Sequence, residues 1–205
     1  MILIPGDNLR KKDSNSYEKN NNYYSKYILL VKEDKTTRLF GYYMPEVNDI
    51  IIGKVIDVLS NGWIIDINSP YLGKLSLKEI GVDPNDLYTY GDYILCQIVR
   101  MTKNKLIDLE IKKKEKLNDG LILKVDPVRI PRLIGKNSSM LNLIKEYLKI
   151  DIIIGKNGRI YLNGNINDIS KAVDIIRFII NNSYKSGLTE KVKEILENNR
   201  NGEEI

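Results

Sequence analysis

Between residues 49 and 115 the sequence alternates short apolar runs with turns that contain glycine or asparagine. The runs are IIIGKVIDVL (50–59), WIIDI (63–67), GKLSL (73–77), GDYILCQIVRM (91–101) and KLIDLEIK (105–112). Most of these runs alternate apolar with polar residues as half-buried strands do. The segment between the third and fourth runs is longer than the others, and a glycine interrupts the first run. This pattern predicts a small closed barrel of five strands, which constrains the fold more than any other part of the chain.

The pattern changes after a lysine-rich connector, and residues 118–182 predict a layer of helices against one sheet. The segments are a strand LILKVD, a short helix PVRIPRLIG, an amphipathic helix SSMLNLIKEYL, a hairpin DIIIGKNGRIYLNG and a long amphipathic helix NDISKAVDIIRFIINN. The apolar residues of the two longer helices recur at helical spacing. The order strand, helix, loop, helix, strand, strand, helix is therefore an α/β arrangement.

The two ends of the chain complete a mixed multidomain architecture. Residues 1–48 predict a small β domain with a hairpin in KYILLVKEDKTTRLFGYY and a polar loop in NSYEKNNNYYSKY, and they hold too little apolar content for a core of their own. Residues 183–205 predict a surface helix and a tail. The expected domains are thus 1–48, the barrel at 49–115, the α/β layer at 118–182, and the tail at 183–205.

Composition removes most classes of enzyme. The chain has no histidine and one cysteine, Cys96, which excludes an internal disulfide, a Cys/His zinc site and imidazole catalysis. The carboxylates are scattered, so we expect no catalytic residue, no metal and no cofactor. No apolar run approaches the roughly 18 residues of a membrane span, and the start MILIPGDNLRKK lacks the apolar core of a signal peptide. We expect a cytoplasmic protein.

Positive charge is concentrated in the α/β segment. Of the net charge of +5, residues 118–182 contribute +4, from ten lysines and arginines against six acidic residues. An excess of this kind favours a polyanionic partner such as nucleic acid, although a solubilising surface explains it equally well.

The stretch RLIGKNSSML in this segment is similar to the phosphate-clamping GxxG loop of KH RNA-binding domains, with Ser138 at the second glycine. Gly135 would let a sugar–phosphate backbone approach, and Lys136 adds a cation. Arg129 and Arg132 lie just upstream. Alternatively, Ser138 is the N-cap of the helix that follows. A second match, GKNG at 155–158, is explained by a hairpin turn, because Asn-Gly favours such turns.

In the barrel, which is of the OB type, Trp63 and Tyr71 are candidates for stacking on bases. Trp63 shares strand parity with two isoleucines, so it could equally belong to the core. Arg100, Lys103 and Lys105 surround a strand turn and are either phosphate contacts or a solvated turn.

Taken together, these segments resemble the RNA-binding cap subunit of the archaeal exosome of the S1/KH type. The segments that carry the resemblance are IPGD (4–7), GYYMPEVNDIIIGKV (41–55), GWIIDINSPYLGKL (62–75), YGDYILCQI (90–98), RIPRLIGKNSSM (129–140) and IGKNGRIYLNG (154–164). The resemblance implies a non-catalytic protein, three copies of which sit on a ring of RNase PH-like subunits and guide single-stranded RNA 3′ ends into it for phosphorolytic 3′-to-5′ degradation.

The resemblance also implies roles for particular residues. The RNA-binding residues would be Trp63, Tyr71, Arg100, Lys103, Lys105, Arg129, Arg132, Gly135, Lys136, Asn137 and Ser138, and the ring contacts would be Pro5, Gly6, Asp7, Tyr42, Tyr43 and Pro45. Ser138 stands where the family usually has glycine. This difference makes RNA binding by the barrel more favoured than RNA binding by the KH loop.

Two other functional classes fit the domain order less well. An S1/KH translation or ribosome-associated factor is the main alternative, and the single KH-like layer directly after the barrel distinguishes the cap subunit from it. A nuclease in its own right is the enzymatic alternative. The family's other cap type carries a zinc ribbon, which one cysteine and no histidine argue against.

Overall fold

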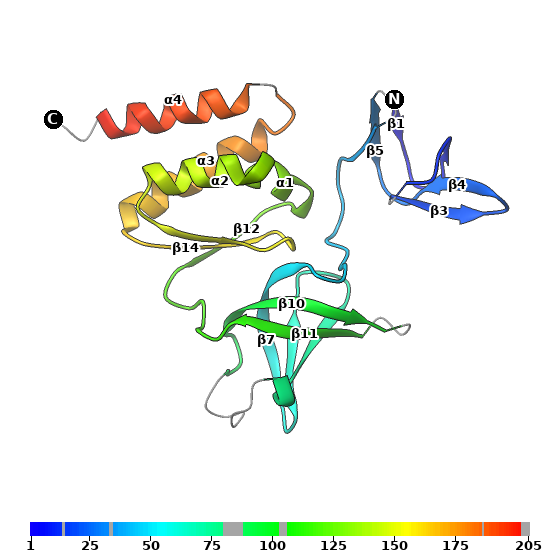
Figure 1. The fold of residues 1–205 in the computed structure, drawn as a ribbon, viewed down its shortest axis with the longest axis horizontal. Helices are drawn as coiled ribbons and strands as arrows, with labels where there is room; N and C mark the ends of the chain where they lie inside the picture. Colours follow the sequence, from blue (N-terminus) through cyan, green and yellow to red (C-terminus); the bar gives the residue numbers. More distant parts are fainter. Residues whose placement is uncertain (14, 33–34, 80–87, 103–105, 186, 202–205) are drawn as a thin grey trace. The chain divides into compact units, whose positions relative to one another are not determined.

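The structure, a computed structural model, describes residues 1–13, 15–32, 35–79, 88–102, 106–185 and 187–201. The chain divides into two compact units, Met1–Tyr42 and Tyr43–Ile205, here called the N-terminal and C-terminal units. Figure 1 shows their elements. Lys103 and Lys105, which the sequence assigns to RNA binding, lie outside the described residues.

The N-terminal unit contains two small antiparallel sheets. One sheet has the order β1 (Ile2–Leu3), β5 (Leu29–Lys32) and β6 (Lys35–Arg38), and the other has the order β2 (Asn8–Leu9), β4 (Asn22–Ser25) and β3 (Ser16–Lys19). The predicted hairpin of β5 and β6 is confirmed. The expectation that this segment lacks a core is wrong, because one leucine each from β1, β2 and β5 packs into a small apolar cluster.

The segment that the sequence predicts as a polar loop is instead the β3–β4 hairpin. Asn20 and Asn21 occupy its turn, and both have positive φ angles of 52° and 60°. Asparagine tolerates this left-handed conformation, which a two-residue hairpin turn requires. The rings of Tyr17 and Tyr24 stack across the strands with centroids 5.5 Å apart. Cross-strand pairing therefore orders a sequence whose polarity resembled that of a loop.

The C-terminal unit begins with the predicted barrel, which is confirmed as a closed sheet of five strands. The strands are β7 (Ile50–Leu59), β8 (Gly62–Asp66), β9 (Leu72–Ser76), β10 (Tyr93–Met101) and β11 (Ile107–Lys113), and a short turn of 3-10 helix (Leu77–Glu79) follows β9. All neighbours pair antiparallel except β9 and β11, which pair parallel. Gly53 is required in β7, because a Cβ there would lie 2.3 Å from the Ile65 side chain across the barrel.

The predicted α/β layer follows the barrel, and its order of elements is confirmed. It contains β12 (Leu121–Lys124), α1 (Ile130–Ile134), α2 (Ser139–Tyr147), β13 (Asp151–Ile154), β14 (Arg159–Asn163) and α3 (Ile166–Asn181), with 3-10 turns at Pro127–Arg129 and Lys136–Ser138. The sheet order is β12-β14-β13, and the helices lie on one face of the sheet (Figure 1).

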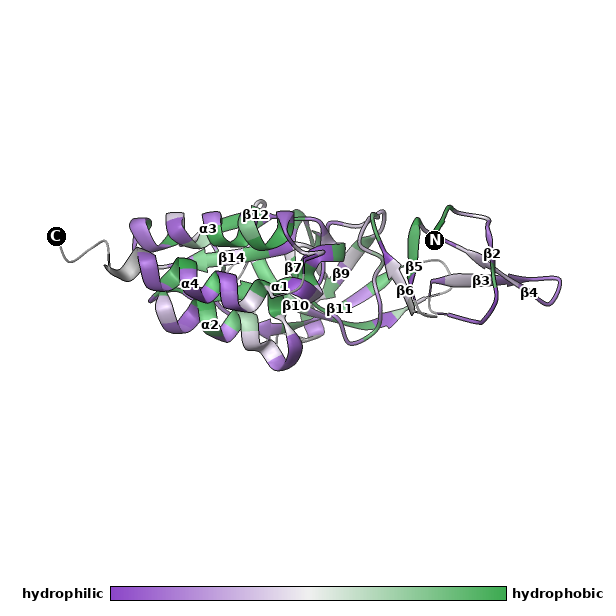
Figure 2. Cartoon of the chain, turned by 90° about the horizontal axis from the view of Figure 1, so that it is seen from above, coloured by the Kyte–Doolittle hydropathy of each residue, from purple (hydrophilic) through white to green (hydrophobic). Residues whose placement is uncertain are grey.

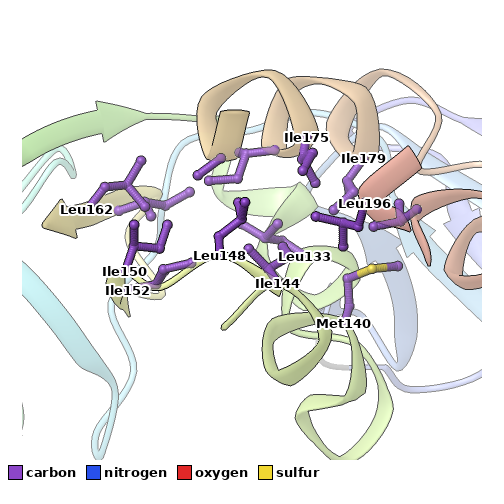
Figure 3. Close-up of a cluster of buried hydrophobic side chains, with 14 of the residues drawn as sticks. Leu133, Met140, Ile144, Leu148, Ile150, Ile152, Leu162, Ile175, Ile179 and Leu196 are labelled. Atoms are coloured by element: carbon purple, nitrogen blue, oxygen red, sulfur yellow. The ribbon is translucent and has the colours of Figure 1, made fainter. Parts of the chain in front are cut away.

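The core of this layer forms where the apolar faces of the helices meet the sheet. Figure 3 shows the side chains of Ile175 and Ile179 of α3 near those of Leu133 and Ile144. The side chain of Asn165 accepts a hydrogen bond from the backbone N–H of Asn167, which caps the start of α3.

The tail forms α4 (Leu188–Asn201), the surface helix that the sequence predicts, and one apolar face of this helix packs against the layer. Leu188, Val192 and Leu196 recur at four-residue spacing and are buried in the core. In Figure 2, apolar and polar residues alternate along α3 and α4, as expected for helices with one apolar face. Within the described ranges, no helix has the length and apolar content that crossing a membrane requires.

Candidate nucleic-acid interface

The loop from Gly135 to Ser138 joins α1 to α2, the place that the sequence predicts. Gly135 has φ 75° and ψ 172°, a conformation that is essentially restricted to glycine. A Cβ at this position would also lie 2.8 Å from the backbone nitrogen of Met140. The glycine is therefore required by the turn itself, whether or not a phosphate binds there. Lys136 and Asn137 are exposed at the tip of the loop.

The prediction that the Ser138 side chain caps α2 is wrong. Ser138 occupies the N-cap position, but its φ and ψ are 62° and 18°, and its hydroxyl makes no capping hydrogen bond. A capping side chain usually needs an extended backbone, and this backbone is left-handed. Asn137 is left-handed as well, with φ 52°. Ser138 therefore stands at a position whose geometry suits the glycine of the GxxG pattern.

Arg129 and Arg132 lie beside the loop, and both contact the segment that connects α3 to α4. Arg129 Nη1 donates a hydrogen bond to Ser183 Oγ (2.9 Å), and Arg132 Nη2 donates to the backbone oxygen of Lys185 (2.7 Å). Each guanidinium has five N–H donors, so these contacts leave donors for a phosphate. The structure thus brings a further segment, residues 183–185, to the two arginines that precede the predicted loop.

The sequence interpretation missed this connector. Its weak signal is a tyrosine and a lysine, Tyr184 and Lys185, in a polar stretch between two amphipathic helices. Nothing in the spacing indicates that it folds back beside a loop some fifty residues earlier in the chain.

On the barrel, the assignment of Trp63 to base stacking is wrong. Its indole is fully buried and belongs to the barrel core. Trp63 Nε1 donates to the backbone oxygen of Tyr88 (3.0 Å), and the two rings meet edge to face with centroids 5.5 Å apart. A buried tryptophan needs such a partner for its N–H, and this one has no face open to a base.

The other barrel candidates lie nearer the surface. Tyr71 is half-buried and packs against the barrel core. Arg100 is exposed, but it forms an ion pair with Asp108, with an Nη2–Oδ2 distance of 2.6 Å. An RNA-binding role for Tyr71 and Arg100 stays a prediction.

The segments that the resemblance assigns to the ring divide into exposed and buried residues. Pro5 and Gly6 form an exposed turn, in which the Asp7 carboxylate accepts a hydrogen bond from the backbone N–H of Ile4 (2.8 Å). Tyr42 is also exposed.

Tyr43 and Pro45 are buried, and a ring-contact role for their side chains is wrong. The hydroxyl of Tyr43 donates to Asp49 Oδ2 (2.6 Å), and burial together with this carboxylate raises the pKa of the phenol. Tyr43 therefore stabilises the barrel and leaves no surface for a partner.

The GKNG motif forms the β13–β14 turn, as the sequence predicts, and it also joins the α/β sheet to the barrel. The buried Asn157 side chain donates to the backbone oxygens of Ile52 (2.8 Å) and Ile67 (2.9 Å). Arg159 Nη1 donates to the backbone oxygens of Ile52 (3.0 Å) and Asp66 (2.6 Å), and its Nη2 pairs with the Asp66 carboxylate.

Apolar contacts accompany this polar junction. Tyr161 of β14 faces Ile52 of the barrel, whereas its neighbours Ile160 and Leu162 face the helices. The strand β14 is therefore buried on both faces, which holds the barrel and the α/β layer together.

Comparison with known protein families assigns one domain to the barrel segment and a second domain to the α/β layer. Residues 42–87 match the S1 domain characteristic of Rrp4, and residues 120–168 match the KH domain. The exosome complex component Rrp4 of Picrophilus torridus is 35% identical to this chain. The match covers 98% of this chain and 94% of the length of that relative. The chain belongs to the Rrp4 family.

Other relatives extend the likeness within the Rrp4 family. The Rrp4 of Pyrococcus horikoshii is 33% identical over 95% of this chain and 82% of its own length. A crystal structure described as that of an exosome complex RNA-binding protein superimposes with a TM-score of 0.71 at 31% identity, over 80% of this chain and all of the other. The S1 and KH domains of this Rrp4-family chain are binding domains, not catalytic ones.

Proposed function

We propose that this protein is a non-catalytic cap subunit of an archaeal exosome that captures single-stranded RNA and guides its 3′ end into a phosphorolytic ring. The observation that carries the proposal is the likeness to proteins named exosome complex component Rrp4 over nearly the whole chain, including both domains. The resemblance further suggests three copies on a ring of RNase PH-like subunits.

The arrangement of the C-terminal unit supports RNA capture. The loop at Gly135 carries Lys136 and lies beside Arg129 and Arg132, in the segment with the largest excess of positive charge. Cations of this kind attract a phosphate backbone without reading its sequence. Because the junction around Arg159 fixes the barrel to the KH layer, one RNA strand could contact both domains without a cost for ordering them.

The N-terminal unit supports docking on a protein partner. Met1, Ile2 and Ile4 expose apolar side chains at one strand, next to the turn at Pro5. In Figure 2, this part of the unit is apolar, whereas the β3–β4 hairpin is polar. Contiguous apolar side chains on a small surface are typical of protein interfaces.

Three measurements test the proposal. The tagged chain should recover RNase PH-like subunits from its native extract, whereas recovery of ribosomal subunits would favour a translation factor. The purified chain should bind single-stranded RNA with an affinity that falls as salt concentration rises, and it should not shorten RNA in the presence of Mg²⁺. Shortening of the RNA by the chain alone would contradict a non-catalytic role.

A further inference from the structure

The connector between α3 and α4 holds an exposed tyrosine at the tip of a closed turn. The backbone N–H of Lys185 donates to the oxygen of Asn182 (2.9 Å), so Ser183 and Tyr184 are the central residues of the turn. The side chain of Asn182 donates to the oxygen of Phe178 (2.9 Å), which ties the turn to the end of α3. Tyr184 is 76% exposed.

Two arginines, one from the 3-10 turn before α1 and one from α1, anchor the residues on both sides of this tyrosine. Arg129 binds the Ser183 hydroxyl, and Arg132 binds the Lys185 carbonyl. The backbone that carries Tyr184 is therefore fixed, although its ring is in solvent. Arg132 is three residues before Gly135, so the helix that begins the loop also holds the turn that carries the ring.

The surroundings of the ring are cationic. Lys185 Nζ lies 5.6 Å from the centroid of the Tyr184 ring, and Lys136 is exposed on the neighbouring loop. Between residues 182 and 190 of the sequence, the acidic residue is Glu190, which lies in the first turn of α4. An aromatic ring among cations suits a base stacked on the ring with its phosphates held nearby, whereas a protein partner would more often meet a contiguous apolar patch.

Resting on the RNA-binding function proposed above, we infer that Tyr184 is a stacking platform for one base of single-stranded RNA, and that Lys185 and the Gly135–Lys136 loop bind the adjacent phosphates. This platform supplies aromatic contact that the loop lacks. Tyr184 would take the stacking role that the sequence predicts for Trp63, because the Trp63 ring is buried in the barrel. The platform reads no sequence, because every base has a face that stacks.

Fluorescence anisotropy of the full chain with a fluorescein-labelled oligouridylate of about 12 nucleotides tests this inference. Tyr184→Ala should raise the Kd about fivefold or more, and Tyr184→Phe, which keeps the ring, should leave it within about twofold of the wild type. Phe40→Ala is the control, because Phe40 is an aromatic residue of the N-terminal unit that is 59% exposed. Its Kd should not change. Thermal unfolding followed by circular dichroism should give the same midpoint for all four proteins.

The outcomes separate the inference from the function on which it rests. If the wild-type chain fails to bind the oligonucleotide, the RNA-binding function is overturned and the platform with it. If the wild type binds and Tyr184→Ala binds equally well, the platform alone is overturned. An equal loss in Tyr184→Ala and Tyr184→Phe would also overturn stacking, because the hydroxyl would then be the contact. Crosslinking of 4-thiouridine RNA to the peptide that contains Tyr184 would support the platform directly.

Discussion

Arg159 of the KH sheet and Asp66 of the barrel form an ion pair in which the arginine side chain is only 1% exposed. The guanidinium also donates to the backbone oxygens of Ile52 and Asp66. A charge buried this deeply is tolerated because the carboxylate and the carbonyls accept hydrogen bonds from its two Nη groups, although its buried Nε has no hydrogen-bond partner among the described residues. The pair makes the two domains of the C-terminal unit dependent on each other.

Removing this arginine should destabilise the C-terminal unit. Arg159→Ala removes the arginine donors to the Asp66 carbonyl and carboxylate and one of the two side-chain donors to the Ile52 oxygen, and we expect a loss of about 3 kcal/mol in the free energy of unfolding. Lys156→Ala is the matched control. Its ion pair with Asp49 joins the same two domains, but the lysine is 58% exposed, and the buried Asp49 carboxylate keeps hydrogen bonds from the Tyr43 hydroxyl and the Glu46 backbone N–H. We therefore expect a loss below about 1 kcal/mol. Urea denaturation measures both losses, and equal losses would contradict the role of burial.

Acid should destabilise the protein through buried carboxylates. Burial alone raises the pKa of Asp92, but hydrogen bonds from Lys116, the Thr89 backbone and Asn118 outweigh it and lower the pKa below its usual range. The unfolded chain then binds more protons, so this stability is present above the unfolded pKa of about 4 and is lost as the pH falls through the lower folded value.

Urea denaturation between neutral pH and about pH 3 checks this dependence. Asp92→Asn should reduce the acid-induced loss of stability. Glu194→Gln, at an exposed position of α4, should leave it unchanged. A pH dependence that is the same in Asp92→Asn and wild type would rule out this carboxylate as a source.

The loop glycine should be required for folding as well as for binding. Gly135→Ala places a Cβ against the Met140 backbone in a conformation that alanine rarely adopts, so we expect a loss of about 2 kcal/mol in the free energy of unfolding. Gly91→Ala is a useful comparison. Gly91 also has a positive φ, but a Cβ there would meet no atom within 4 Å. Gly135→Ala should be the more destabilised of the two in thermal denaturation.

Ser138 should tolerate glycine and bind RNA more tightly with it. A left-handed conformation costs a residue other than glycine about 1 kcal/mol, and the greater freedom of glycine in the unfolded chain offsets a similar amount. We therefore expect Ser138→Gly to leave stability nearly unchanged. The Kd for single-stranded RNA should fall about threefold, since the backbone at this position becomes easier to approach. An unchanged Kd would show that Ser138 does not restrict the loop.

The exposed apolar strand of the N-terminal unit should be needed for ring docking. Ile2→Asp places a charge on a side chain that is exposed in the isolated chain, so stability should change by less than about 0.5 kcal/mol. Recovery of RNase PH-like subunits in a pull-down should be lost, because the charge would be buried at the interface. Asn22→Asp adds the same charge to the other sheet and should leave recovery intact. Normal recovery with Ile2→Asp would place docking elsewhere.

Local pattern was sufficient for the barrel and the KH layer. Strand alternation and helical spacing are properties of neighbouring residues, and they survive in the fold because the same residues form its cores. The β3–β4 hairpin of the N-terminal unit could not be predicted this way. Its strands hold asparagine and tyrosine, and its order comes from the left-handed turn at Asn20 and Asn21 and from pairing across the strands.

By itself the sequence determined the order of the domains, the position of the Gly135 loop and the exclusion of histidine catalysis and of a Cys/His zinc site within this sequence, because each of these follows from residue type and spacing. Only the tertiary structure decided which side chains of each kind are exposed. It placed Trp63 inside the barrel, made Asn157 and Arg159 part of the junction between domains, and anchored the turn that carries Tyr184 to the arginines that precede the loop. These outcomes depend on contacts between segments far apart in the chain, which local periodicity does not encode.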